Sequence, residues 1–185
     1  MELDKAIKSR HSSKEFKQKK PDWRTIIECI DSARYAPMAG NIFTLKFILV
    51  DNKEKIKKIS KACQQQFIAK ANYVVVVCSS SSATANAYGK KAEIYCRQQA
   101  GAGIQNFLLK IQEAGLATSW VGAFVEEQIQ RELVIPEGIN VEAVFPIGYE
   151  IKKPTKQKKK INLDQALYFN KYGNKKMKPI KKINV

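Results

Sequence analysis

The widest apolar stripe in the sequence recurs at helical spacing over residues 91–115. A helix with so broad an apolar face belongs in the centre of a domain. Its four small residues at 100–103 allow another backbone to come close, and Gly115 is its expected C-cap. We therefore place this helix at the centre of the fold. Its stripe comprises Ile94, Gly101, Ile104, Leu108 and Ile111, with Ala100 and Phe107 beside it.

Shorter amphipathic helices are expected elsewhere in the chain. One opens after Pro21, where Asp22 is the expected N-cap, and a turn with Pro37 and Gly40 follows its end. Its predicted apolar face comprises Trp23, Ile26, Ile27, Ile30 and Ala33. The remaining helices are predicted over residues 2–9, 53–62 and 126–133.

Strands are predicted between these helices. The segment Tyr73–Cys78 is apolar at successive positions, as in an interior strand. The serine run at 79–82 predicts a flexible connection from this strand to a helix. Because strands and helices alternate, the pattern favours a three-layer α/β or α+β domain. The other strands are predicted over residues 44–50, 118–121 and 141–149.

Length and composition restrict the class of protein. A chain of 185 residues with 44% hydrophobic residues suits one domain with a sizeable core. Its longest apolar run is much shorter than the roughly 20 residues of a membrane-spanning helix, and no signal-type run lies near the start. Four cysteines without metal-ligand spacing are expected to be reduced, and with a single histidine they argue against a metal site. We expect a cytoplasmic protein with no membrane segment.

The net charge of +16 is unevenly distributed. Residues 151–185 contain twelve lysines and one acidic residue, Asp164. Such a stretch could attract nucleic acid, anionic lipid or phosphate groups. A basic nucleic-acid-binding module is therefore one alternative, although no nucleic-acid motif frames the aromatic residues of this stretch.

The first candidate site is the loop at residues 10–16, which follows the first helix. Arg10 offers a rigid fork of donors that suits phosphate oxygens, and Ser12 adds a neutral donor. Lys14 supplies a point charge that could lie near an anionic ring. By itself the segment also matches a solvated basic loop.

Two uncharged segments could contact the rest of a flat ligand. The turn at residues 36–41 exposes backbone donors, and the amide of Asn41 can pair with an amide-like edge. In the segment 115–124, Gly122 and Ala123 carry little side chain, so a flat ligand could lie against their backbone.

Taken together and in this order, the segments resemble the nitroreductase family from about residue 3 to residue 164. The loop at 10–16 is similar to the family's Arg-Arg/His-Ser-x-Arg/Lys-x-Phe element, and residues 36–41 to its Ala-Pro-Ser-x-x-Asn turn. The segment 120–124 (Trp-Val-Gly-Ala-Phe) resembles Trp-Ile-Gly-Ala-Phe of the small members. Pro-Ile-Gly-Tyr at 146–149, followed by basic residues, is typical of the end of the domain.

The resemblance implies an α+β fold of three α/β/α layers, with a central mixed, mainly antiparallel sheet. It implies an FMN-binding domain over residues 1–164 and a lysine-rich extension over 165–185 that packs on the domain or on a partner subunit. FMN would lie at the interface of a homodimer. The implied FMN contacts are Arg10, Ser12, Lys158 and Lys160 at the phosphate and ribityl chain, with His11 beside them; Lys14, Gln65 (or Gln64), Gly122 and Ala123 at the ring; and Pro37, Met38, Ala39 and Asn41 from the other subunit.

The implied activity is hydride transfer from NADH or NADPH through flavin N5 to an electron-poor small molecule, such as a nitroaromatic, a quinone or a flavin. The mechanism would be ping-pong, with no catalytic acid or base from the protein. Proteins of this fold that dehalogenate, dehydrogenate or break down flavin are the alternative. The chain departs from the family at Met38, where serine is usual, and at Gln99, where an acidic residue is common. Only lysines, at positions 156–160, stand where the last basic contact is often arginine.

Overall fold

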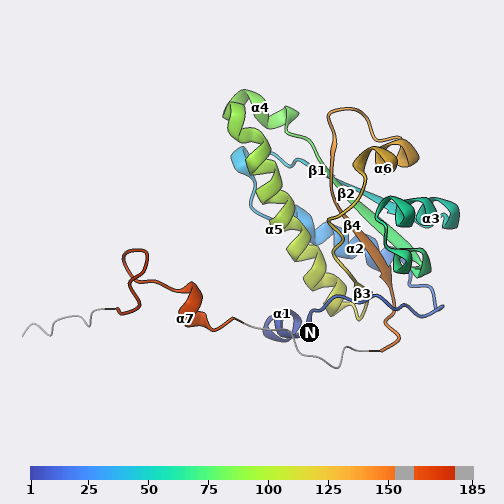
Figure 1. Cartoon of the computed structure of the whole chain (residues 1–185), viewed down its shortest axis with the longest axis horizontal. Helices are drawn as coiled ribbons and strands as arrows, with labels where there is room; N and C mark the ends of the chain where they lie inside the picture. Colours follow the sequence, from blue (N-terminus) through green and yellow to red (C-terminus); the bar gives the residue numbers. More distant parts are fainter. Residues whose placement is uncertain (153–160, 178–185) are drawn as a thin grey trace, which may run out of the picture. The chain divides into compact units, whose positions relative to one another are not determined.

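The computed structural model describes residues 1–152 and 161–177. Its contacts divide the chain into two compact units, Met1–Pro154 and Thr155–Val185. The first unit holds every described strand and every described helix except one (Figure 1). The domain boundary predicted at residue 164 lies beyond this division, and the packing of the C-terminal extension stays a prediction.

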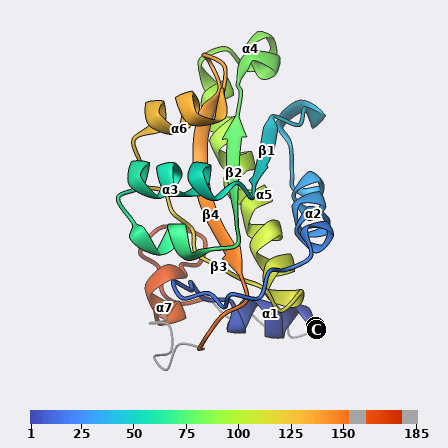
Figure 2. The same cartoon turned by 90° about the vertical axis from the view of Figure 1, so that its right-hand side faces the viewer.

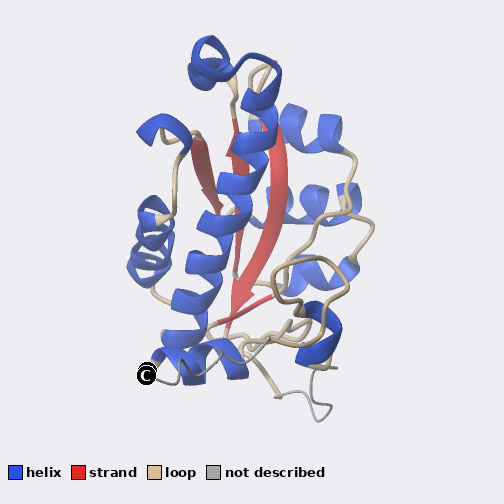
Figure 3. Cartoon of the chain, turned by 90° about the vertical axis from the view of Figure 1, so that its left-hand side faces the viewer, coloured by secondary structure: helices blue, strands red, loops and turns tan. Residues whose placement is uncertain are grey.

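The first unit is built on a four-stranded sheet with the strand order β1-β2-β4-β3. Figure 3 shows this sheet in red among the helices. Each strand pairs with its neighbours in the antiparallel sense, so the mainly antiparallel sheet is confirmed, and the described strands include no parallel pair. The central strand β2 is buried at every position because both of its edges are paired and both of its faces are covered. The strands are β1 (Leu45–Val50), β2 (Tyr73–Ser79), β3 (Ala117–Thr118) and β4 (Asn140–Gly148).

Helices cover both faces of the sheet, which confirms the three-layer α+β architecture (Figure 2). Helices α2 and α5 pack on one face, and α3 and α6 pack on the other. Because side chains alternate along a strand, Val75 and Val77 of β2 join the first hydrophobic cluster, and Val74 and Val76 join the second. The four helices are α2 (Trp23–Asp31), α3 (Lys53–Ala62), α5 (Ala92–Glu113) and α6 (Glu126–Leu133).

Local signals account for several helix ends. The carboxylate of Asp22 accepts a hydrogen bond from the backbone N–H of Arg24 at 2.9 Å, which confirms the predicted N-cap. Gly115 has a left-handed φ of +70° just after α5, as expected of a C-cap glycine. Ser79 ends β2 and Ser82 begins the short helix α4, so the serine run joins a strand to a helix. The remaining elements of the first unit are α1 (Leu3–Ser9), α4 (Ser82–Tyr88) and 3-10 helices at Ser32–Tyr35, Ala39–Asn41, Gln66–Lys70 and Gly89–Lys91.

Part of the apolar surface predicted for the core faces outward instead. Trp23 and Ile27 of α2 are 44% and 46% exposed, and Ile94 of α5 is 55% exposed. Helix α2 buries the side that carries Ile26 and Cys29, and one sheet face covers only part of the stripe on α5. The stripe is therefore wider than the core of this chain requires.

The second unit contains the short helix α7 (Leu163–Ala166) and an aromatic turn. The rings of Tyr168 and Tyr172 lie 4.6 Å apart between centroids, and the ammonium of Lys175 lies 3.9 Å from the centre of the Tyr168 ring. Across the described parts of both units, no helix is long and apolar enough to cross a membrane.

Candidate functional site

The loop at residues 10–16 is anchored to the end of the sheet. The backbone N–H of Ser13 donates to the carbonyl of Thr118 at 2.9 Å, and Phe16 forms an isolated β-bridge with Glu150. Gly148 makes this close approach possible, because a Cβ at that position would lie 3.1 Å from the ring of Phe16. The loop, β3 and the end of β4 therefore form one structural group.

Glu150 holds the loop through two side-chain contacts, and no sequence motif pointed to it. One oxygen of its carboxylate, Oε1, lies 2.6 Å from Nε2 of His11 and accepts a hydrogen bond from the hydroxyl of Ser13 at 2.8 Å. The other ring nitrogen of His11, Nδ1, lies 2.8 Å from the carbonyl oxygen of Ser9. Both ring nitrogens of His11 thus have partners just outside the loop, one in α1 and one after β4. The only signal in the sequence was an acidic residue two positions before the lysine run, which begins at Lys152.

The remaining polar residues of the loop face solvent. Arg10 is partly exposed, Ser12 and Lys14 are exposed, and Arg10 forms no ion pair with any residue that the structure describes. The ammonium of Lys14 lies 5.3 Å from the ring centre of Phe67. This contact brings the loop beside the 3-10 helix Gln66–Lys70. Gln65, which directly precedes that helix, is partly exposed.

An exposed backbone strip follows β3 along the edge of the sheet. Val121 bridges to Val144 of β4, and Gly122 and Ala123 are exposed. A Cβ at Gly122 would have only the indole of Trp120 within 4 Å, so the backbone here is open. The hydroxyl of Thr118, at the start of the strip, is buried and has no hydrogen-bond partner among the described residues. We call the loop at 10–16 and this strip together the loop half.

The predicted turn at residues 37–41 lies elsewhere in the first unit. Pro37, Met38 and Ala39 share a shallow hollow with Tyr95 and Gln98 of α5, among other residues. Gly40 and Asn41 have left-handed φ values of +61° and +56°, so the tight turn is confirmed. We call residues 37–44 the turn half.

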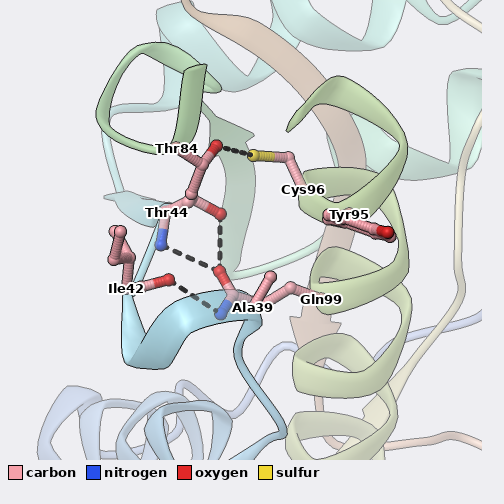
Figure 4. Close-up of a pocket in the computed structure, with 7 residues that line it drawn as sticks. All are labelled: Ala39, Ile42, Thr44, Thr84, Tyr95, Cys96 and Gln99. Atoms are coloured by element: carbon pink, nitrogen blue, oxygen red, sulfur yellow. Dashed lines mark hydrogen bonds between the residues drawn. The ribbon is translucent and has the colours of Figure 1, made fainter. Parts of the chain in front are cut away.

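A buried amide attaches the turn half to α5 (Figure 4). Oε1 of Gln99 accepts hydrogen bonds from the backbone N–H of Thr44 at 2.8 Å and from its hydroxyl at 2.5 Å. Nε2 of Gln99 donates to the carbonyl oxygen of Ile42 at 3.3 Å. The side chain that the sequence marked only as a departure from the family is therefore part of the structure of the turn.

The two halves lie near opposite ends of α5 within one chain (Figure 1). The turn half contacts the helix around Gln99, whereas β3 follows its last residue, Glu113, and the N-terminal amine lies 3.4 Å from the carboxylate of Glu113. Glu113 lies fourteen positions after Gln99 in the helix, which corresponds to about 20 Å at the usual rise per residue. One chain thus brings together the residues predicted on the loop and strip, but not the turn.

The other predicted contacts, Lys158 and Lys160, lie outside the described residues. No group of three or more His, Cys, Asp or Glu side chains that could hold a metal occurs in the described part of the chain. Burial raises the pKa of Cys29 and of Cys63 to about 12 and that of Cys78 to about 11. These thiols therefore stay protonated and unreactive at neutral pH.

Comparison with known proteins identifies the family. A protein from Archaeoglobus fulgidus, named "Putative NADH dehydrogenase/NAD(P)H nitroreductase", is 30% identical over 150 residues, covering 78% of this chain and 83% of that protein. A nitroreductase family protein from Clostridium novyi NT is similar in structure, with a TM-score of 0.76 and 26% identity over 94% of this chain and 96% of that chain. The fold also matches the NADPH:FMN oxidoreductase from Vibrio harveyi complexed with NAD+, with a TM-score of 0.82 and 17% identity over 92% of this chain and 77% of that chain.

The profile of the nitroreductase family matches residues 7–149, a span that includes the loop, the turn, the strip and the whole sheet. With that match and the sequence identity to the archaeal relative, the chain belongs to the nitroreductase family of enzymes, as its motifs predicted.

Proposed function

We propose that this chain is an FMN-dependent NAD(P)H oxidoreductase that acts as a homodimer and reduces an electron-poor small molecule. The observation that carries the proposal is the loop half, where the side chains of Arg10 and Ser12 have no ion-pair or hydrogen-bond partner among the described residues and lie beside an open backbone strip. Such a surface suits a ligand with a phosphate at one end and a flat ring at the other.

The donor set of the loop half fits FMN. Arg10 and Ser12 offer a charged fork and a hydroxyl to the phosphate, and we propose Lys158 and Lys160 as further phosphate contacts. Gly122 and Ala123 would receive the ring because both are exposed, and a Cβ at Gly122 would have only the indole of Trp120 within 4 Å. The hydroxyl of Thr118, which has no hydrogen-bond partner within the described parts of the chain, adds a buried polar atom beside the same strip. His11 would keep the loop in shape, because its two ring nitrogens already contact Ser9 and Glu150.

When bound, FMN would supply the hydride-transfer chemistry between NADH or NADPH and the acceptor, and we propose a ping-pong order. The protein's residues bind and orient the reactants. Lys14, which approaches the Gln65–Phe67 segment, would place a positive charge at the pyrimidine edge and stabilise negative charge there. We assign no proton transfer to a side chain, and we propose a nitroaromatic, a quinone or a flavin as the acceptor.

A second copy of the chain would complete the site. We propose that Lys14 and Asn41 reach one ring from different chains, because the residues of α5 nearest the turn and the loop, Gln99 and Glu113, lie about 20 Å apart along the helix. The exposed apolar residues Trp23, Ile27, Tyr35 and Ile94 lie on or beside α2 and α5, and a Cβ at Gly101 would have no neighbour within 4 Å. An obligate dimer interface, on the order of 2,000 Å² or more, would cover such a surface.

Subunit complementation tests this arrangement. Arg10→Ala removes a phosphate contact, and Asn41→Gly removes the amide while keeping the left-handed backbone that glycine adopts freely. If the halves come from different subunits, a mixed dimer of the two variants contains one intact site and one with both defects. FMN bound to refolded mixtures should then exceed the content of either variant alone. Equal content would show that both residues act in one chain and would overturn the shared site.

The identity of the cofactor needs a separate measurement. Flavin released by acid from the purified protein, or taken up on reconstitution, should be FMN, and anaerobic NADH or NADPH should bleach its absorbance. Binding of FAD, or of no flavin, would overturn the proposal. Dehalogenation of a halogenated aromatic by the reduced protein would favour the alternative within the fold, and steeply salt-dependent nucleic-acid binding without flavin would favour a nucleic-acid-binding module.

We also propose a cytoplasmic location. The four cysteines are all free and buried, which suits a reducing compartment.

A further inference from the structure

Gln99 makes more inter-element hydrogen bonds than any other buried side chain of α5 in the described structure. It is 4% exposed and joins the helix to residues 42 and 44 through three bonds, two accepted and one donated. The side chains of Ala39, Thr84, Tyr95 and Cys96 close around it and leave no space for a water molecule (Figure 4). If the amide is altered and the surrounding side chains stay in place, water therefore cannot replace these hydrogen bonds.

The turn half has few other polar attachments. Within residues 37–44, the turn makes its own short-range bonds, from Asn41 N–H to the carbonyl of Met38 and from Ile42 N–H to that of Ala39. The backbone N–H of Ser80 donates to the carbonyl of Thr44. Among the described residues, Gln99 alone provides side-chain hydrogen bonds to this segment from outside it.

The backbone of the turn requires such support. Gly40 and Asn41 are consecutive left-handed residues, a conformation that asparagine tolerates but does not prefer. Ile42 and Thr44 follow directly, so bonds to them hold the exit of the turn against α5. A shift of the exit would move the amide of Asn41 and the backbone of Pro37–Ala39, which are the groups proposed to contact the flavin of the other subunit.

We propose that Gln99 is a positioning residue for the flavin site: it holds the turn half in the conformation that binds FMN. The inference rests on the proposed function. An amide suits the position because its oxygen takes two donors from Thr44 while its nitrogen faces the carbonyl of Ile42. An ionised carboxylate could replace the first two contacts but would set oxygen against oxygen at Ile42. A protonated carboxyl could donate to that carbonyl and restore the third contact.

The test uses Gln99→Glu, which has nearly the shape of glutamine and makes the third contact only when protonated. FMN affinity of the apoprotein dimer is measured by flavin fluorescence from pH 5 to pH 9, with far-UV circular dichroism to monitor the fold. Gln128→Glu, an exposed residue of α6, is the matched control for the added charge. Burial raises a carboxyl pKa, so the variant should bind like the control at the acid end. At the alkaline end it should bind about tenfold or more weakly, the effect of a broken hydrogen bond next to a buried charge.

A milder variant keeps the inference falsifiable if Gln99→Glu does not fold. Thr44→Val removes one donor, preserves the shape of the side chain and should weaken FMN binding about two- to tenfold at every pH. If the natural protein binds FMN, and Gln99→Glu follows Gln128→Glu at every pH or Thr44→Val binds FMN unchanged, the inference is wrong and the proposed function stands. If the natural protein binds no FMN, both are wrong.

Discussion

The loop half and the turn half are held in place by different chemistry. The loop half depends on Glu150, a carboxylate that contacts His11 and Ser13 and whose side chain is 13% exposed. The turn half depends on Gln99, a neutral amide that is 4% exposed and contacts mainly backbone. Each residue links the proposed binding segment to the sheet or to the helix that covers it. A carboxylate thus supports the half proposed to bind the phosphate and one side of the ring, and a neutral amide supports the half proposed to contact the ring from the other subunit.

This difference has a physical basis. A contact made by a partly exposed carboxylate responds to salt, because dissolved ions screen its charge. A buried neutral hydrogen bond does not respond to salt but fails when its geometry or its neutrality is lost. The two halves should therefore be separable by conditions as well as by mutation.

The largest expected effect is a loss of stability that destabilises the loop half and the turn half together. Phe145 is fully buried in β4 and packs edge-to-face on Phe107 and on Trp120, with ring centroids at 5.5 Å and 5.6 Å. Phe145→Ala should lower the free energy of unfolding by about 3–5 kcal/mol, because it leaves a cavity between the sheet and α5. Urea denaturation measures this loss. A variant that is nearly as stable as the natural protein would show that the sheet does not support the two halves jointly.

The next effect distinguishes the two halves by how FMN affinity depends on salt. Arg10→Ala should weaken FMN binding by about 1.5–3 kcal/mol through the loss of charge-assisted bonds to the phosphate, and the loss should shrink as salt is added. Asn41→Gly should also weaken binding, but by an amount that salt does not change.

Lys14→Ala should cost less FMN affinity than Arg10→Ala and should alter the reduction potential of the bound flavin. Titrations at low and high ionic strength measure these differences, and Lys8→Ala, which removes an exposed lysine paired with Asp4, is the control. Equal salt dependence for Arg10→Ala and Asn41→Gly would contradict the assignment of charge to one half.

A smaller effect concerns the anchor of the loop half. Glu150→Ala leaves the buried hydroxyl of Ser13 and the ring of His11 without their acceptor, which should lower stability by about 1–3 kcal/mol. Glu150→Gln keeps an acceptor oxygen and should cost less. Thermal unfolding of the apoprotein measures both variants. If alanine were no worse than glutamine, the carboxylate would not be holding the loop.

The smallest effect concerns the buried cysteines of the core, outside both halves, and the stability of the fold at high pH. Burial raises the pKa of Cys29 and Cys63 to about 12 and of Cys78 to about 11, above the ordinary value of 9.0. The unfolded chain therefore releases these protons first, so stability is complete below about pH 9 and falls as the pH rises toward 11 to 12. Stability measured against pH should decline in this window in the natural protein and less in Cys63→Ala. Rapid alkylation of the folded protein at pH 8 would contradict the burial of these thiols.

Periodicity and local capping signals determined most of the secondary structure. The helices predicted at residues 53–62 and 126–133 and the buried strand at 73–78 are present, and Asp22 caps α2. These features depend on contacts within a few residues, so the order of side chains along the chain is sufficient to predict them. The family motifs also placed the loop, the turn and the strip correctly as segments.

Tertiary structure decided which helix faces are buried and which polar groups form hydrogen bonds with each other. Nothing local distinguishes exposed Ile94 from buried Ile104 on α5, because both follow the same helical spacing. His11 meets Glu150 across 139 positions of sequence and Gln99 meets Thr44 across 55, so neither anchor has a local signal. The placement of the two halves near opposite ends of α5 likewise follows from how the helix lies on the sheet. Sequence spacing therefore determined the elements and the candidate residues, and only the packing of distant elements determined which of those residues can act together.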